Sequence, residues 1–152
     1  MDSPDDSQEF EYPDATMDHD TMFAYMESHF GYDAQQTTAF MGAHALGNLH
    51  RSASGYEGTF TDGAHKKLNN AYFSDMFDSS LTWTESQLRK TKVWQYDAES
   101  VGTRLHTDFE LLYNIQLNDD DSSSCYLSEC GNADTYDLAY EYATVSKFLV
   151  LP

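Results

Sequence analysis

A single histidine, His44, interrupts an apolar run in this sequence. Residues 40–47 read Phe-Met-Gly-Ala-His-Ala-Leu-Gly, and helical spacing places His44 beside Met41 and Ala43 on one face. An imidazole in this position can bind a metal. A lone histidine on such a face is more often a core residue that hydrogen-bonds to a neighbour. Periodicity alone leaves both interpretations open.

Two cysteines, Cys125 and Cys130, lie in the polar, turn-rich loop Ser-Ser-Ser-Cys-Tyr-Leu-Ser-Glu-Cys-Gly-Asn. Their spacing allows a short disulfide loop, which would favour an oxidising compartment such as the extracellular space or an organelle lumen. Two free thiols are an alternative. A metal site is a third, although zinc normally needs four ligands and no second cysteine pair follows.

The composition is strongly acidic. The 152 residues include 8 Lys plus Arg and 26 Asp plus Glu, for a net charge of −18. Such a charge repels nucleic acid and anionic membrane surfaces, so neither is an expected partner. No run of about eighteen apolar residues occurs, so we expect no membrane span. With 40% apolar residues, the chain can bury the core of one domain.

The spacing of apolar residues predicts a mainly α fold with a small β or irregular excursion. Residues 1–18 are expected to form an acidic, extended lead-in, and residues 19–152 a helical domain. Gly31 is placed to end the first helix, and Asp33 with Gln36 forms a capping box for the second. Helices are expected at 19–30, from Asp33 to about Asn48, at 65–78, from Thr107 through Leu117 and at 134–149, with an ordered loop at 50–63 and a hairpin or irregular segment within 81–96.

Taken as a longer pattern, residues 40–60 resemble the proximal signature of the plant-type haem peroxidase superfamily. They read Phe-Met-Gly-Ala-His-Ala-Leu-Gly-Asn-Leu-His-Arg-Ser-Ala-Ser-Gly-Tyr-Glu-Gly-Thr-Phe. Among its members, cytochrome c peroxidase and ascorbate peroxidase are the most similar. The resemblance continues in Leu-Asn-Asn-Ala-Tyr-Phe at 68–73, around Trp83 and Trp94, and in Leu-His-Thr-Asp-Phe at 105–109. It implies the proximal half of the haem-peroxidase fold.

The resemblance also implies a cofactor site for haem b. His44 matches the axial iron ligand, and Asp108 matches the carboxylate that accepts a hydrogen bond from the other imidazole nitrogen. Such a carboxylate makes the imidazole electron-rich and lowers the iron reduction potential, which favours peroxide cleavage. His50 and Ser54 match positions near the propionates, although without the motif His50 would equally be read as a solvated loop residue. The expected cofactor-binding residues are His44, Met41, Ala43, Gly47, His50, Ser54 and Phe60.

Three positions depart from the family pattern. Phe60 falls where cytochrome c peroxidase and ascorbate peroxidase carry a tryptophan beneath the haem. Because phenylalanine is harder to oxidise, no stable side-chain radical is expected there. Ala45 and Ala53 stand where ascorbate peroxidases have a cation-ligating threonine and a substrate-contacting arginine. Neither a proximal potassium ion nor ascorbate is therefore expected.

The distal helix of the family, with Arg, an aromatic residue and His in that order, has no counterpart in this sequence. Arg51, Arg89 and Arg104 are the arginines, and none is followed by the required pair. No distal catalytic residue is therefore identified. Without a distal half, the apolar face around His44 would be exposed unless another polypeptide covered it. Our first hypothesis is a haem-binding oxidoreductase that uses hydrogen peroxide when another polypeptide, within a larger complex, provides the distal half.

Two alternatives belong to other functional classes. The chain could be a degenerate peroxidase half, a pseudoenzyme that serves as an accessory or structural subunit of a larger assembly without turnover, because a fold can outlive its chemistry. It could also be an acidic cation-binding or carrier protein that uses Asp119–Asp121. That run lacks the glycine and spaced glutamate of an EF-hand.

Overall fold

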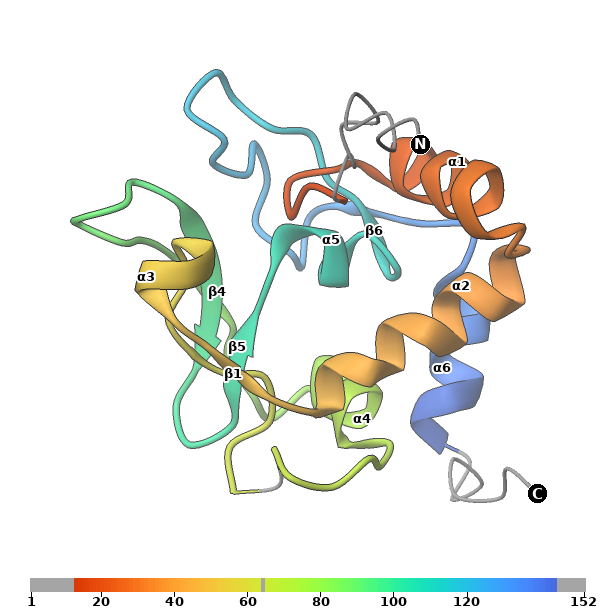
Figure 1. The fold of residues 1–152 in the computed structure, drawn as a ribbon, viewed down its shortest axis with the longest axis horizontal. Coiled ribbons are helices and arrows are strands. Elements are labelled where there is room, and N and C mark those ends of the chain that lie inside the picture. Colours follow the sequence, from red (N-terminus) through yellow and green to blue (C-terminus); the bar gives the residue numbers. More distant parts are fainter. Residues whose placement is uncertain (1–12, 64, 145–152) are drawn as a thin grey trace, which may run out of the picture.

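The fold is mixed, with more helix than strand, in a computed structural model that describes residues 13–63 and 65–144. Figure 1 shows α1, α2, α4 and α6 on one side, β1, β4 and β5 on the other, and the short α5 between them. The expectation of a helix-rich fold is confirmed in part, because helix exceeds strand, but a mainly α description is too narrow. The elements are α1 (His19–Phe30), α2 (Ala34–Met41), the 3-10 helix η1 (Gly42–Ala45), β1 (Asn48–Leu49), α3 (Arg51–Ser54), β2 (Gly58–Thr59), α4 (Ala71–Phe77), β3 (Thr84–Gln87), β4 (Trp94–Ala98), β5 (Gly102–Arg104), α5 (His106–Phe109), β6 (Tyr113–Asn114), β7 (Gly131–Asn132) and α6 (Tyr136–Thr144).

The first two helices begin as the local sequence predicts. The side chain of Asp18 accepts a hydrogen bond of 2.8 Å from the Thr21 N–H and caps α1, which ends at Gly31 with a left-handed φ of 68°. Asp33 accepts from the Gln36 N–H at 2.8 Å, and the Gln36 side chain accepts from the Asp33 N–H at 3.0 Å. The predicted first helix and the capping box of the second are confirmed.

The second helix ends earlier than predicted. It stops at Met41 and tightens into η1, where the Leu46 N–H donates to the Ala43 carbonyl at 3.0 Å. The Gly47 N–H instead donates to the distant His65 carbonyl at 2.9 Å. Asn48 then opens β1, which pairs antiparallel with β2. The expected extension to Asn48 was wrong because these tertiary hydrogen bonds replace helical ones.

The helix predicted from Thr107 through Leu117 is reduced to one turn, α5. The Leu111 carbonyl accepts from the Thr135 hydroxyl and the Leu112 carbonyl from the Ala133 N–H, each at 2.9 Å. Since a distant segment takes these carbonyls, the chain leaves the helix and forms β6, which pairs with β7.

Three further predicted segments have different bounds in the structure. The helix expected at 65–78 begins at Ala71, and the loop expected at 50–63 contains α3 and β2. The last helix begins at Tyr136, and its predicted residues 145–149 lie outside the described residues. Residues 1–12 of the acidic lead-in also lie outside them. Residue Ala15 of the same lead-in packs near α5, since its carbonyl accepts from the Thr107 N–H at 3.1 Å.

The predicted hairpin is confirmed, and it gains a third strand. β3 pairs with β4 in antiparallel register from Thr84 opposite Asp97 to Gln87 opposite Trp94, and β4 pairs with β5. β5 leads into α5 through Leu105 alone, so the end of this sheet sets the position of α5. The sequence pattern does not predict β5.

The main core lies between the helices and this sheet. α4 packs against α6, and Phe109 of α5 contacts the rings of Trp83 and Tyr96 at centroid distances of 5.4 and 5.0 Å. A disulfide joins Cys125 to Cys130, with a Cα–Cα distance of 5.7 Å. Within the described residues, no helix combines the length and apolar character that crossing a membrane requires.

Gly102 fixes the contact between β5 and β2. It has a φ of +138°, and an added Cβ would lie 2.6 Å from the Thr59 carbonyl oxygen and 2.8 Å from that of Phe60. We expect Gly102→Ala to lower the free energy of unfolding by about 3 kcal/mol, because a methyl group adds both backbone strain and a clash with main chain.

The measurement is urea denaturation, with Gly131→Ala as the matched control. Gly131 has no atom within 4 Å of an added Cβ and lies on β7. Equal midpoints for the two variants would contradict the proposed close contact of β5 with β2.

Candidate functional site

His44 and Asp108 form the centre of the candidate site. His44 Nδ1 lies 2.7 Å from Asp108 Oδ1, although the residues are 64 positions apart in the chain. An ionised carboxylate can only accept, so His44 Nδ1 donates the proton of this hydrogen bond. A neutral imidazole then carries its lone pair on Nε2, and His44 keeps 32% of its side chain exposed. Such an imidazole can ligate a metal through Nε2.

Asp108 is fully buried, yet it is held as a carboxylate. Burial by itself would raise its pKa, but His44, Arg104 and the Leu105 N–H outweigh burial and lower the pKa below its ordinary value. Asp108 Oδ2 accepts from the Leu105 N–H at 2.6 Å, and Oδ1 also accepts from the Tyr72 hydroxyl at 2.7 Å. These donors satisfy the buried charge and fix both carboxylate oxygens.

Tyr72 and Phe60 hold the imidazole from two directions. The Phe60 ring is stacked on His44 at a centroid distance of 4.2 Å and an interplanar angle of 10°. The Tyr72 ring meets His44 edge-on at 6.1 Å and 80°. Burial and the neighbouring Asp108 raise the pKa of Tyr72 well above its ordinary value, so its hydroxyl remains a donor. The ring of His44 therefore has a fixed plane and a fixed tautomer.

Arg104 is a fully buried cation whose charge stabilises the Asp108 carboxylate. Its guanidinium donates to the carbonyl oxygens of Phe60, Thr103 and Tyr72, the last two at 3.0 Å. It also lies 4.9 Å from the centroid of the Tyr72 ring. Burial lowers the pKa of Arg104, and the charge of Asp108 opposes this effect. The two opposite charges make each other's burial tolerable.

Sequence reasoning missed the roles of Tyr72 and Arg104. The helical spacing of apolar residues in α4 predicts that Tyr72 is a core aromatic residue. That spacing does not indicate what its hydroxyl binds. The sequence offers Arg104 only as one of three arginines without the distal aromatic and histidine partners. The one available signal was an arginine that directly precedes the Leu-His-Thr-Asp run.

The other candidate cofactor residues fall into two groups. Met41 is buried near the core, while Ala43 and Gly47 are exposed next to His44. His50 and Ser54 are exposed at α3, where Ser54 Oγ donates to the His50 carbonyl at 3.4 Å. In the described part of the chain, no hydrogen bond or ring contact joins either of them to His44. The structure thus brings His44, Phe60 and Asp108 together.

Part of this chain is similar to haem peroxidases. A Candida albicans protein named as a heme-binding peroxidase is 35% identical to it over 83 residues, which are 54% of this chain and 28% of that protein. Mitochondrial cytochrome c peroxidase of Cryptococcus neoformans is 31% identical over 102 residues, 66% of this chain and 26% of that protein. The cytosolic L-ascorbate peroxidase 2 of Oryza sativa is 31% identical over 76 residues, 50% of this chain and 30% of that protein.

The similarity covers only part of this chain and only part of each haem peroxidase. The chain spans less than a third of the length of each of these relatives. No family model matches the chain. The similarity therefore supports the family resemblance drawn from residues 40–60, and the activity of a whole peroxidase does not follow from it.

The hydroxyl of Tyr72 provides a direct test of how Asp108 is held. We expect Tyr72→Phe to lower the free energy of unfolding by about 2 kcal/mol, because it removes a buried hydrogen bond to a charged acceptor and leaves the aromatic ring in place. Urea denaturation measures the change.

Tyr126→Phe is the matched control, since Tyr126 is 79% exposed. Its expected effect is below about 0.5 kcal/mol. Similar losses in the two variants would show that the Tyr72 hydroxyl does not support the buried carboxylate.

Proposed function

We propose that this chain is the haem-holding, proximal half of a peroxidase-like oxidoreductase, with His44 Nε2 as the axial ligand of haem b. The hydrogen bond from His44 Nδ1 to the buried Asp108 carboxylate carries the proposal. A metal-ligating histidine normally donates its other ring N–H to a carboxylate or carbonyl, which fixes the tautomer and raises ligand basicity. The partial similarity to haem peroxidases supports the same assignment.

The residues around His44 fit an apolar macrocycle. Phe40 and Leu46 are large apolar side chains that flank His44 in the chain, and they are 53% and 39% exposed. Burying exposed apolar groups of this size is favourable, and a porphyrin face would take them out of water. Phe60 adds an apolar ring that is already stacked on the imidazole. The candidate site thus offers a ligand nitrogen among apolar side chains.

The protein groups would determine the electronic character of the site. Haem, when bound, supplies an iron centre able to react with peroxide, and an imidazole hydrogen-bonded to a carboxylate lowers its reduction potential. Arg104 limits the negative charge that Asp108 can pass to His44, because its positive charge stabilises the same carboxylate. Phe60 cannot hydrogen-bond to Asp108, so Tyr72 and Leu105 serve as the further donors.

Peroxide turnover, on this proposal, requires a distal half from another polypeptide or from a further segment. The 152 residues contain no run of Arg, aromatic and His, which would move the proton between the two peroxide oxygens. The exposed Phe40 and Leu46, which flank His44 in the chain, support an additional covering partner. The proposed unit is therefore a cofactor-binding half whose activity depends on completion.

A visible spectrum of the purified chain titrated with haemin tests the assignment of His44. We expect one equivalent of haem to bind with a Soret band and high-spin ferric features, and His44→Ala to lose them because the axial nitrogen is gone. His29→Ala is the matched control, since His29 is exposed on α1. A folded, colourless protein after haemin addition would contradict haem binding and favour the accessory-subunit alternative.

The missing distal groups lead to a second expectation. The haem-loaded chain alone should react with hydrogen peroxide at least about a hundredfold more slowly than a complete haem peroxidase, because general acid–base assistance contributes roughly that much or more. Stopped-flow spectroscopy of the loaded chain measures this rate. A rate equal to that of a complete enzyme would show that this chain does contain a distal proton-transfer group.

A further inference from the structure

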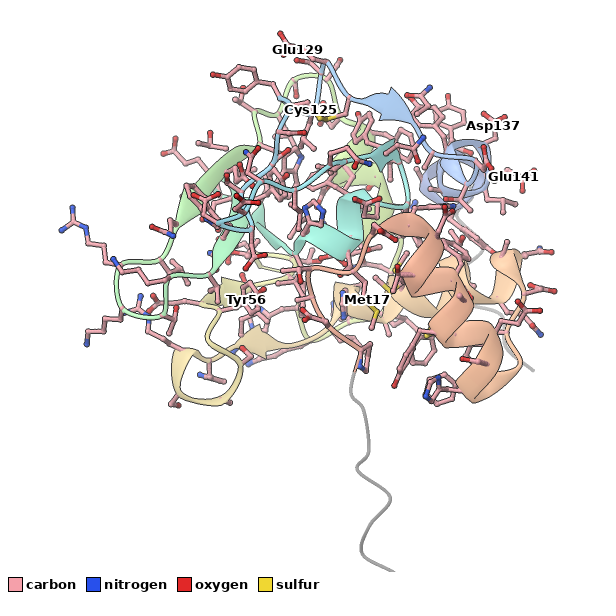
Figure 2. The ribbon with its side chains drawn as sticks, turned by 90° about the horizontal axis from the view of Figure 1, so that it is seen from above. Met17, Tyr56, Cys125, Glu129, Asp137 and Glu141 are labelled. Carbon is pink, nitrogen blue, oxygen red and sulfur yellow. A yellow bond between two sulfur atoms is a disulfide. The ribbon has the colours of Figure 1, made fainter. Side chains whose placement is uncertain are left out.

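A hollow at the disulfide loop has the features of a second binding site. It has a volume of about 560 Å³, within the usual range of small-molecule pockets. One wall is formed by Trp83, Glu85 and Tyr96 from the β3–β4 hairpin, and the other by residues 123–127 with Glu129. Figure 2 places Cys125 and Glu129 at one edge of the molecule, well apart from Tyr56. Tyr56 belongs to the apolar cluster of Phe60, so the hollow lies away from the candidate haem site.

The buried hydroxyl of Tyr96 lies close to the Ser123 side chain, but it forms no hydrogen bond of good geometry with it. Tyr96 is 3% exposed, and its hydroxyl makes no hydrogen bond of acceptable geometry. The nearby Ser123 hydroxyl donates to the Cys125 carbonyl at 2.7 Å instead. A buried hydroxyl without a partner is unfavourable, and such groups in native proteins call for an explanation. A polar ligand group in the hollow would provide the missing hydrogen bond.

The charge of the hollow favours a cationic ligand. Glu85 and Glu129 line it, and its described lining residues include no Lys or Arg. Glu85 Oε1 accepts from the Ser123 N–H at 2.8 Å, which holds this carboxylate against the loop. Burial raises the pKa of Glu85, so its charged form would be stabilised by an added cation. The net charge of −18 adds long-range attraction for cations.

Aromatic side chains give the hollow an apolar lining as well. Trp83, Tyr96 and Tyr126 all contribute to it. Phe109 packs against Trp83 and Tyr96, and the buried Arg104 lies 5.0 Å from the centroid of the Trp83 ring, so the wall that contains Trp83 and Tyr96 is fixed from the interior. Tyr126 is 79% exposed and can adjust to a ligand. Aromatic rings beside a carboxylate are a common setting for organic ammonium groups.

We propose that this hollow binds a small aromatic ammonium compound, with the ammonium group donating to the Glu85 carboxylate and the Tyr96 hydroxyl and the ring packed against Trp83 and Tyr126. The disulfide between Cys125 and Cys130 constrains the loop that forms the second wall. The site does not depend on haem, so its test is independent of the proposed function.

Isothermal titration calorimetry of the full chain without haem, with tyramine as the probe, tests this site. We expect tyramine to bind with a Kd of about 1 mM or tighter, and its neutral analogue tyrosol to bind at least about tenfold more weakly because it lacks the ammonium charge. Circular dichroism of the same preparation establishes that the protein is folded. Folded protein that gives no binding signal with tyramine, or equal affinities for the two compounds, would overturn the proposal.

Matched variants locate the site. Glu85→Gln keeps an acceptor for the Ser123 N–H but removes the charge, and it should weaken tyramine binding about tenfold. Glu99→Gln makes the same charge change at an exposed residue that does not line the hollow, and it should alter the Kd less than about twofold. Tyr96→Phe should weaken binding about threefold or more, through loss of the hydroxyl. Equal Kd values for the two glutamate variants would place tyramine elsewhere.

Discussion

The buried carboxylate of Asp108 is the constraint on which the candidate site depends. Removing a carboxylate from water is costly unless hydrogen bonds and an opposite charge compensate for it. Here the Leu105 N–H, the Tyr72 hydroxyl and His44 Nδ1 all donate to it, and Arg104 adds a buried positive charge. His44 takes its orientation from this arrangement. The same contacts join η1, α4, β5 and α5.

Short irregular elements, rather than long helices, position these groups. η1 carries His44 directly after α2 ends. β5 places Arg104 two residues before α5, whose single turn contains Asp108. Gly102 lets β5 approach the backbone of Phe60 closely, and Phe60 is the residue stacked on His44. The imidazole and its carboxylate are therefore coupled to the sheet as well as to the helices. A change in sheet packing would be transmitted to the imidazole through main-chain contacts.

The partial similarity to haem peroxidases and the His44–Asp108 hydrogen bond support the same family resemblance. The relatives are matched over about half to two thirds of this chain, while the chain spans less than a third of each relative. The disulfide-loop hollow lies at another edge and uses Glu85, Tyr96 and Trp83, of which Trp83 also contacts Phe109 and Arg104. The candidate haem site and the disulfide-loop hollow are therefore linked through Trp83, Phe109 and Arg104, but they do not share a binding surface.

The sequence by itself determined the features that depend on near neighbours. Gly31 ends α1 and the Asp33–Gln36 capping box starts α2, because each cap involves residues only a few positions apart. The family resemblance singled out His44 and Asp108 as a pair. Tertiary structure decided the rest. The Leu111 and Leu112 carbonyls bond to residues 133–135, which ends α5 although the apolar period continues. Tyr72, 36 positions away, and Arg104 became partners of Asp108 because one buried charge had to be satisfied, and helical or strand period cannot encode that demand.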